Sequence, residues 1–196
     1  WASGVRMFEL NRLSTKPRRI NVIGTSGSGK STFARRLAQK LNYPYIEMDQ
    51  VFWGPNWHWP SDDVFLGNLK DQLRGESWVL DGNYTRSMGI KWQRVEMVIW
   101  LDFSFPLTLF RAVTRAFGRA LTKEELWPGT GNRESFRKSF LSKESIILWT
   151  IKTHSPVRRK YESIIADPQY AHIHFVRLRS PREAKQFLER ISLSAD

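Results

Sequence analysis

Short apolar runs alternate with amphipathic segments along the chain, and this alternation predicts its secondary structure. Runs of the length of one buried strand occupy residues 20–23, 45–48, 77–80, 95–101 and 172–178. Apolar positions at helical spacing predict helices from residue 30 and over about 62–73, 106–120, 133–153, 156–166 and 181–191. Strands that alternate with helices form a parallel sheet with helices on both faces. We therefore expect a three-layer α/β fold with a five-stranded parallel sheet.

A glycine-rich octapeptide joins the first predicted strand to the first predicted helix. It reads Gly24-Thr25-Ser26-Gly27-Ser28-Gly29-Lys30-Ser31, and its spacing matches a phosphate-binding P-loop. Its glycines let successive backbone N–H groups point at a phosphate, and the following helix aims its positive end at the same anion. Lys30 supplies a charge for the β- and γ-phosphates, and Ser31 supplies a hydroxyl for Mg²⁺. A Gly/Ser turn that contains a lysine by chance would need neither the strand before it nor the helix after it. We therefore take this octapeptide and Thr32 as the candidate nucleotide-binding residues.

Three aspartates follow predicted strands, namely Asp49, Asp81 and Asp102. In a parallel sheet of this kind, ligands bind beyond the carboxyl ends of the strands. Three carboxylates at one edge repel each other unless cations lie among them, which favours a function for one or two of them. Asp49 either caps a turn or binds and deprotonates an acceptor hydroxyl, and the sequence leaves both readings open. We expect Asp102 to anchor the loop that follows it.

The positive charge of the chain is concentrated in two places. The net charge is +12; residues 1–20 carry five basic residues and one acidic residue, and residues 111–160 carry twelve basic against four acidic residues. Within this block Arg111, Arg115 and Arg119 share one helix face, where like charges favour a bound anion over a solvated surface. The block is interpreted as a lid over a triphosphate, inserted at about 119–137, or as a nucleic-acid face.

Composition excludes several kinds of site. The chain has no cysteine, which excludes disulfides, thiolate metal sites and thiol nucleophiles, and its four histidines are scattered. No apolar run approaches the ~18 residues of a membrane span, and no leader is evident, so we expect a cytoplasmic protein. Residues 1–18 are predicted to be a mobile tail and 19–196 a single domain, as a monomer or a homodimer.

An aromatic segment follows the second predicted strand and contains Trp53, Trp57 and Trp59. Such a cluster packs under a long loop, or it stacks on a ligand and excludes water from a closing site. The sequence does not choose between these two readings.

Together these segments resemble the adenylate-kinase-like P-loop kinases, and more closely their bacterial branch labelled DNA topology modulation proteins. The resemblance covers residues 19 to about 192. The segments that carry it are Gly24–Ser31, 45–49 with Phe52-Trp53, 77–86, 98–102, the Arg111/Arg115 pair and 177–180. One more residue precedes Arg86 than in the Asp-Gly-Phe-Pro-Arg segment of adenylate kinase, so AMP is not the expected acceptor.

The resemblance implies roles for particular residues. Asp81 would orient Mg²⁺ together with Ser31, and Arg86 would clamp the acceptor. Arg111 and Arg115 would flank the base and phosphates of ATP, and Arg133 or Arg137 would close from the lid. Arg179, in the last matching segment, joins the candidate nucleotide-binding residues.

The function expected from these features is ATP-dependent phosphoryl transfer to a small molecule or nucleotide. ATP and Mg²⁺ are the expected cofactors, and Lys30, Asp49, Asp81, Arg86, Arg115, Arg133 and Arg137 are the candidate catalytic residues. Two alternatives stay open, which are a nucleic-acid-binding P-loop ATPase and a nucleotide-binding switch without turnover. The acceptor is not identified by the sequence.

Overall fold

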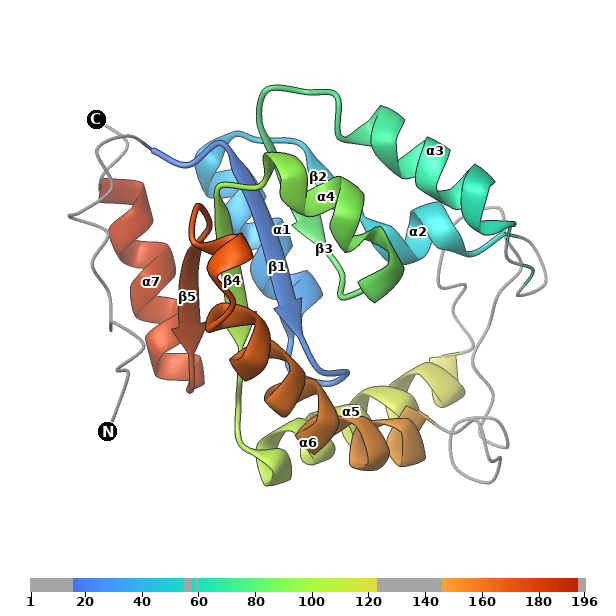
Figure 1. Ribbon diagram of the computed structural model, residues 1–196. Helices are drawn as coiled ribbons and strands as arrows, with labels where there is room; N and C mark the ends of the chain where they lie inside the picture. The colour runs from blue at the N-terminus through green and yellow to red at the C-terminus, as the bar shows by residue number, and fades with distance from the viewer. Residues whose placement is uncertain (1–15, 55–57, 59, 123–145, 194–196) are drawn as a thin grey trace.

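Five parallel strands form one twisted sheet in the order β2-β3-β1-β4-β5 (Figure 1). The computed structural model describes residues 16–54, 58, 60–122 and 146–193. The strands are β1 (Arg19–Gly24), β2 (Tyr45–Glu47), β3 (Trp78–Asp81), β4 (Met97–Leu101) and β5 (His174–Leu178). The predicted fold class, a five-stranded parallel sheet between helices, is confirmed.

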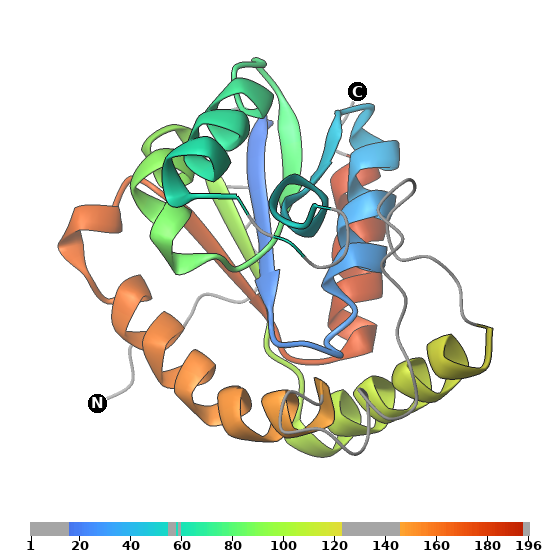
Figure 2. The same cartoon turned by 90° about the vertical axis from the view of Figure 1, so that its right-hand side faces the viewer.

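Helices cover both faces of this sheet. They are α1 (Lys30–Leu41), α2 (Met48–Phe52), α3 (Asp62–Gln72), α4 (Met88–Arg94), α5 (Phe105–Thr122), α6 (Ile146–Ile165) and α7 (Pro181–Leu193). On one face α1 and α7 pack through Phe33 and Phe187, whose ring centroids are 6.1 Å apart. On the other face α2, α3, α4 and α6 bury a cluster that includes Phe65, Trp92 and Tyr161. Figure 2 shows the two helical layers on opposite sides of the strands, with α5 and α6 along the edge below them.

Two helix predictions need correction. Pro156 was expected to separate two helices, but it lies inside the continuous helix α6. Proline costs a helix one backbone hydrogen bond, and burial of His154 and Tyr161 on either side of Pro156 offsets that cost. Helix α4 was not predicted, because a seven-residue helix gives only two buried apolar positions, Met88 and Trp92, from which to recognise a period.

The strand register brings the predicted site to one edge of the sheet. Val22 of β1 lies opposite Asp81 of β3, which in turn lies opposite Glu47 of β2. On its other side β1 runs past β4, so that Gly24 pairs with Leu101. The carboxyl ends of β1, β2, β3 and β4 therefore lie together at the start of the P-loop.

Several predictions fall outside the described residues. These are the lid arginines Arg133 and Arg137, most of the lid segment 119–137, Trp57 and Trp59, and nearly all of the tail 1–18. They stay predictions.

Candidate active site

The P-loop packs tightly on helix α5, which explains its glycines. Gly27 and Gly29 have φ of +83° and +85°, a backbone conformation that other residues rarely adopt. A Cβ at Gly27 would lie 2.4 Å from the carbonyl oxygen of Thr108 on α5. The loop closes with a 3.1 Å hydrogen bond from the Ser28 N–H to the Thr25 carbonyl, and Gly29 is the N-cap of α1. The backbone is therefore fixed in the form that an anion cradle needs.

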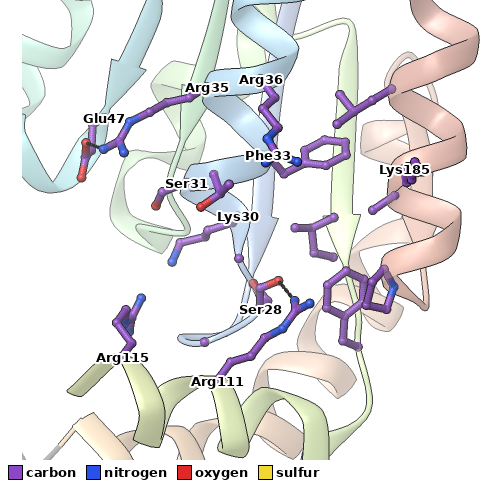
Figure 3. A pocket seen from close by; sticks show the side chains of 18 residues that line it. Ser28, Lys30, Ser31, Phe33, Arg35, Arg36, Glu47, Arg111, Arg115 and Lys185 are labelled. Atoms are coloured by element: carbon purple, nitrogen blue, oxygen red, sulfur yellow. Dashed lines mark hydrogen bonds and ion pairs between the residues drawn. The ribbon is translucent and has the colours of Figure 1, made fainter. Parts of the chain in front are cut away.

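A cleft of about 640 Å³ opens at this loop (Figure 3). Its wall consists of the P-loop, the start of α1, two arginines of α5 and one side of α7. The lining residues are Gly27–Phe33, Arg35, Arg36, Glu47, Leu101, Phe103, Arg111, Arg115, Pro181, Ala184, Lys185 and Leu188. Such a concave, cationic space suits a nucleotide phosphate chain.

Two of the three predicted arginines on α5 contact the P-loop directly. Arg111 donates from Nη1 to the Ser28 carbonyl at 3.3 Å, and its guanidinium lies 5.4 Å from the centre of the Phe103 ring. Arg115 donates from Nη2 to Oγ of Ser26 at 2.8 Å. This face of α5 therefore points at the phosphate loop rather than at bulk solvent.

Asp81 is the buried carboxylate of the site. It ends β3, is 3% exposed, and accepts a 3.0 Å hydrogen bond on Oδ2 from the Tyr45 hydroxyl. No hydrogen-bond partner reaches its other oxygen, Oδ1, within the described part of the chain. Burial raises the pKa of this carboxyl, while the charge of Lys30 and the hydroxyls of Ser31 and Tyr45 lower it. An orphaned buried oxygen beside a serine hydroxyl fits a hard divalent cation such as Mg²⁺ and its bound water.

The Tyr45 hydroxyl also approaches a second carboxylate. It lies 3.3 Å from Oε2 of Glu47, and the same oxygen accepts a 2.9 Å bond from Nη2 of Arg35. The Arg35 guanidinium lies 5.2 Å from the centre of the Tyr45 ring. Burial raises the pKa of the Tyr45 hydroxyl far above its ordinary value, so it remains a proton donor.

Asp49 lies near this carboxylate pair. It was expected at the end of a strand, but β2 ends at Glu47 and Asp49 lies in the first turn of α2. Its Oδ1 accepts a 2.7 Å bond from the Tyr84 hydroxyl, whose pKa is raised by burial and by the Asp49 charge. The Asp49 charge also raises the pKa of Asp81, so the two carboxylates are close enough to interact.

Arg86 follows Tyr84 in a 3₁₀ turn (Thr85–Ser87) and is held from two sides. Its Nη1 lies 2.5 Å from Oδ1 of Asp62, and its guanidinium lies 4.8 Å from the centre of the Phe52 ring. The Arg86 side chain is 42% exposed.

Asp102 has the structural role expected of it. It accepts bonds of 2.9 Å from Arg158 on α6 and 2.8 Å from Arg177 on β5. The Arg177 guanidinium also lies 4.3 Å from the centre of the Trp100 ring. The carboxylate therefore joins β4, β5 and α6 through two cations.

Other candidates lie at the margin of the site. Arg179 is exposed and is not among the residues that line the cleft, whereas Pro181 and Lys185 are. Trp53 is half-buried and packs edge-on against Phe52 at 4.9 Å, in line with the packing reading. In the described residues, no cluster of three His, Asp or Glu side chains could hold a metal, and no helix has the length and apolar character of a membrane span.

The sequence predicted no role in the site for Tyr45, Tyr84, Asn83 or Lys91. Asn83, in the loop after β3, bonds to the backbone of Gly24, and Lys91 of α4 donates to the Gly82 carbonyl of the same loop at 3.2 Å. The spacing of these residues in the sequence does not predict either contact, because Asn83 meets Gly24 only through the pairing of β1 with β3 and Lys91 meets Gly82 only through the packing of α4.

Comparisons with known proteins find kinases that resemble part of this chain in sequence. A family model for shikimate kinase matches residues 26–65. The cytidylate kinase of Mycoplasmopsis synoviae (strain 53) is 35% identical over 54 residues, which are 28% of this chain. The matched segment spans only a quarter of that enzyme (25%).

Two solved structures align with most of the chain. The shikimate kinase from Acinetobacter baumannii in complex with shikimate aligns with a TM-score of 0.51 at 16% identity, covering 89% of this chain and 90% of that one. A gluconokinase from Sinorhizobium meliloti 1021 aligns with a TM-score of 0.48 at 19% identity, covering 91% of this chain and 95% of that one. The first of these supports the P-loop kinase fold. None of these relatives carries the DNA topology modulation label, which stays a prediction.

Proposed function

We propose that this protein is a P-loop kinase that transfers the γ-phosphoryl group of Mg-ATP to a hydroxyl of a small molecule. The observation that carries the proposal is the juxtaposition at one sheet edge of Lys30, Ser31 and the unpartnered Oδ1 of Asp81. A phosphate loop alone binds nucleotide. A buried carboxylate oxygen beside it adds the group that orients a metal for phosphoryl transfer.

The nucleotide is held by charge and by oriented N–H groups. The backbone of residues 24–31 would bind the β- and γ-phosphates, and Lys30 would neutralise charge that develops on the oxygens during transfer. Arg111 and Arg115, fixed against Ser28 and Ser26, would lie along the triphosphate. Ser31 and Asp81 would hold Mg²⁺, which would polarise the phosphate oxygens and neutralise their charge.

The opposite side of the site would bind the acceptor. Asp49 would accept a proton from the attacking hydroxyl, and the 2.7 Å bond from Tyr84 would orient its carboxylate. Arg86, whose side chain is 42% exposed, would bind an anionic group of the acceptor. Arg133 and Arg137 are proposed to complete the site from the segment between α5 and α6.

The similarity to shikimate kinases supports a small hydroxyl compound as acceptor, because shikimate offers a hydroxyl to ATP. The shorter match to a cytidylate kinase makes a nucleoside monophosphate the second class of acceptor to test. We propose that this chain also belongs to the bacterial branch that the sequence resembles, with an acceptor of its own.

An ATP-consumption screen tests the proposal. Purified protein is incubated with ATP and Mg²⁺ against panels of sugar acids, polyols, nucleosides and nucleoside monophosphates, and ADP and phosphorylated product are both quantified. One acceptor should give equal amounts of the two, and Lys30→Ala and Asp49→Asn should abolish both. ADP formation that requires duplex DNA would favour the nucleic-acid ATPase. Nucleotide binding without ADP in any panel would favour the switch.

A further inference from the structure

The Tyr45 hydroxyl lies between two carboxylates that close neighbouring strands. It is 3.0 Å from Oδ2 of Asp81 and 3.3 Å from Oε2 of Glu47. The two carboxylates face each other because Glu47 and Asp81 are paired in the parallel register of β2 and β3. Tyr45 and Glu47, two residues apart, lie on the same side of β2. A phenol carries one proton, so Tyr45 donates to only one carboxylate at a time.

The position of Arg35 indicates which carboxylate accepts the hydrogen bond from Tyr45. Its Nη2 donates to Oε2 of Glu47 at 2.9 Å, the same oxygen that Tyr45 approaches. The Arg35 guanidinium also lies against the Tyr45 ring, 5.2 Å from its centre. Glu47 therefore has a cationic partner of its own, and the shorter contact of the tyrosine is the one to Asp81.

The hydrogen bond from Tyr45 orients the carboxylate of Asp81. With Oδ2 bound by Tyr45, the plane of the carboxylate is fixed, and Oδ1 is left buried and without a partner among the described residues. We infer that Tyr45 is a positioning residue for the proposed magnesium site: it holds Oδ2 of Asp81 so that Oδ1 remains available to a magnesium-bound water beside Ser31. Arg35 and Glu47 hold Tyr45 in this role.

This inference rests on the proposed function, and Tyr45→Phe tests it. The first measurement is the affinity for a non-hydrolysable ATP analogue with and without Mg²⁺, by calorimetry. The affinity without metal stays within twofold of wild type, and the gain in affinity that Mg²⁺ confers falls by about tenfold, the usual cost of removing a group that orients a metal ligand. In turnover assays the Mg²⁺ concentration for half-maximal rate rises by a similar factor, and the rate at saturating Mg²⁺ recovers.

Tyr43→Phe is the matched control. Tyr43 precedes β2 by two residues, is half-buried, and its ring lies below the Lys16 ammonium at 5.7 Å. It loses the same hydroxyl without a contact to Asp81, so its Mg²⁺ dependence stays at the wild-type value. Thermal unfolding of both variants checks that the fold is kept.

A double-mutant cycle separates positioning from a general structural effect. If Tyr45 acts through Asp81, Tyr45→Phe causes little additional loss in an Asp81→Asn background. Additive losses, an unchanged Mg²⁺ response, or an equal loss of metal-free binding each overturn the inference while leaving the proposed function intact. If the nucleotide affinity and the turnover of the wild-type protein do not depend on Mg²⁺, both this inference and the proposed function are wrong.

Discussion

The side-chain amide of Asn83 pairs with the backbone of Gly24 through two hydrogen bonds, one in each direction. The Gly24 N–H donates to Oδ1 at 3.0 Å, and Nδ2 donates to the Gly24 carbonyl at 2.6 Å. Gly24 begins the P-loop, and Asn83 lies two residues after Asp81. This pair therefore sets the distance between the phosphate loop and the carboxylate proposed to orient the metal.

Replacing Asn83 should affect both stability and nucleotide binding. Asn83→Ala leaves a half-buried N–H and carbonyl of Gly24 unpaired, which lowers the unfolding free energy by about 1–3 kcal/mol. It also loosens the P-loop, so the affinity for an ATP analogue falls. Urea unfolding and calorimetry measure the two effects, and Asn68→Ala, on the exposed side of α3, is the control. Wild-type values in both assays would contradict a coupling role.

Lys30→Ala should abolish turnover and leave the fold unchanged. Lys30 lines the cleft at the start of α1, and its proposed role is electrostatic. Removal of one such stabilising group costs roughly 100-fold or more in rate, whereas the unfolding free energy of a cleft-lining residue changes by no more than about 0.5 kcal/mol. ADP formation and urea unfolding are compared with those of Lys40→Ala, in the last turn of the same helix. Equal turnover in both variants would refute the P-loop assignment.

Asp81→Asn should distinguish metal orientation from structure. The amide keeps the size of the carboxylate and removes its charge, so the Mg²⁺-dependent rate should fall at least tenfold while metal-free binding of nucleotide changes little. A titration of rate against Mg²⁺ and a binding assay in a chelator provide the two values. If both fall together, Asp81 supports the sheet edge and does not orient a metal.

The fold and the P-loop could be predicted because their signals are local. The glycine spacing of residues 24–31 and the short apolar runs each lie within a few consecutive residues, and a parallel sheet between helices follows from the alternation of strands and helices. The strand order was not predicted. Asp49 was predicted to follow the end of a strand, but it lies in the first turn of α2. No glycine or proline marks the boundary between β2 and α2, which falls between Glu47 and Met48.

The rest of the site depends on the register between strands. Tyr45 reaches Asp81 only because β2 pairs with β3 in a way that sets Glu47 opposite Asp81. Asn83 likewise meets Gly24 across β1 and β3, 59 residues away in sequence. A tyrosine or an asparagine in isolation signals neither contact, because both residue types occur in ordinary strands and turns.

Asp102→Ala should destabilise the protein without a direct effect on nucleotide binding. The side chains of Asp102 and Arg177 are only 4% and 9% exposed, and without Asp102 the Arg177 guanidinium would keep only the more exposed Glu162 as an acidic partner among the described residues. Removal of one member of a buried ion pair costs about 3 kcal/mol or more. Asp63→Ala, in the exposed first turn of α3, should cost less than about 1 kcal/mol. Chemical unfolding compares the two, and equal losses would show that the Asp102 contacts contribute no special stability.

Lys91 makes the stability of the protein depend on pH. Its side chain is fully buried, donates to the Gly82 carbonyl, and lies 6.0 Å from the centre of the Trp92 ring. Burial lowers the pKa of its amine to about 7, and the positive charge of Lys160 on α6 acts in the same direction. In the unfolded chain the pKa is near its ordinary 10.5. Between these values the unfolded state binds one more proton than the folded state, so the unfolding free energy rises with pH.

Lys91→Met should therefore stabilise the protein at pH 7 and flatten this dependence. The rise due to Lys91 is at most about 1.4 kcal/mol per pH unit above pH 7, and below pH 7 it disappears because both states are protonated. Urea unfolding at pH 7, 8 and 9 measures the slope, and Lys70→Met, on the exposed face of α3, should keep the slope of the wild type. Part of the slope persists in Lys91→Met, because burial also lowers the pKa of Lys160. If wild type and Lys91→Met gain stability equally between pH 7 and 9, Lys91 is charged in the folded protein and its burial is compensated by another group.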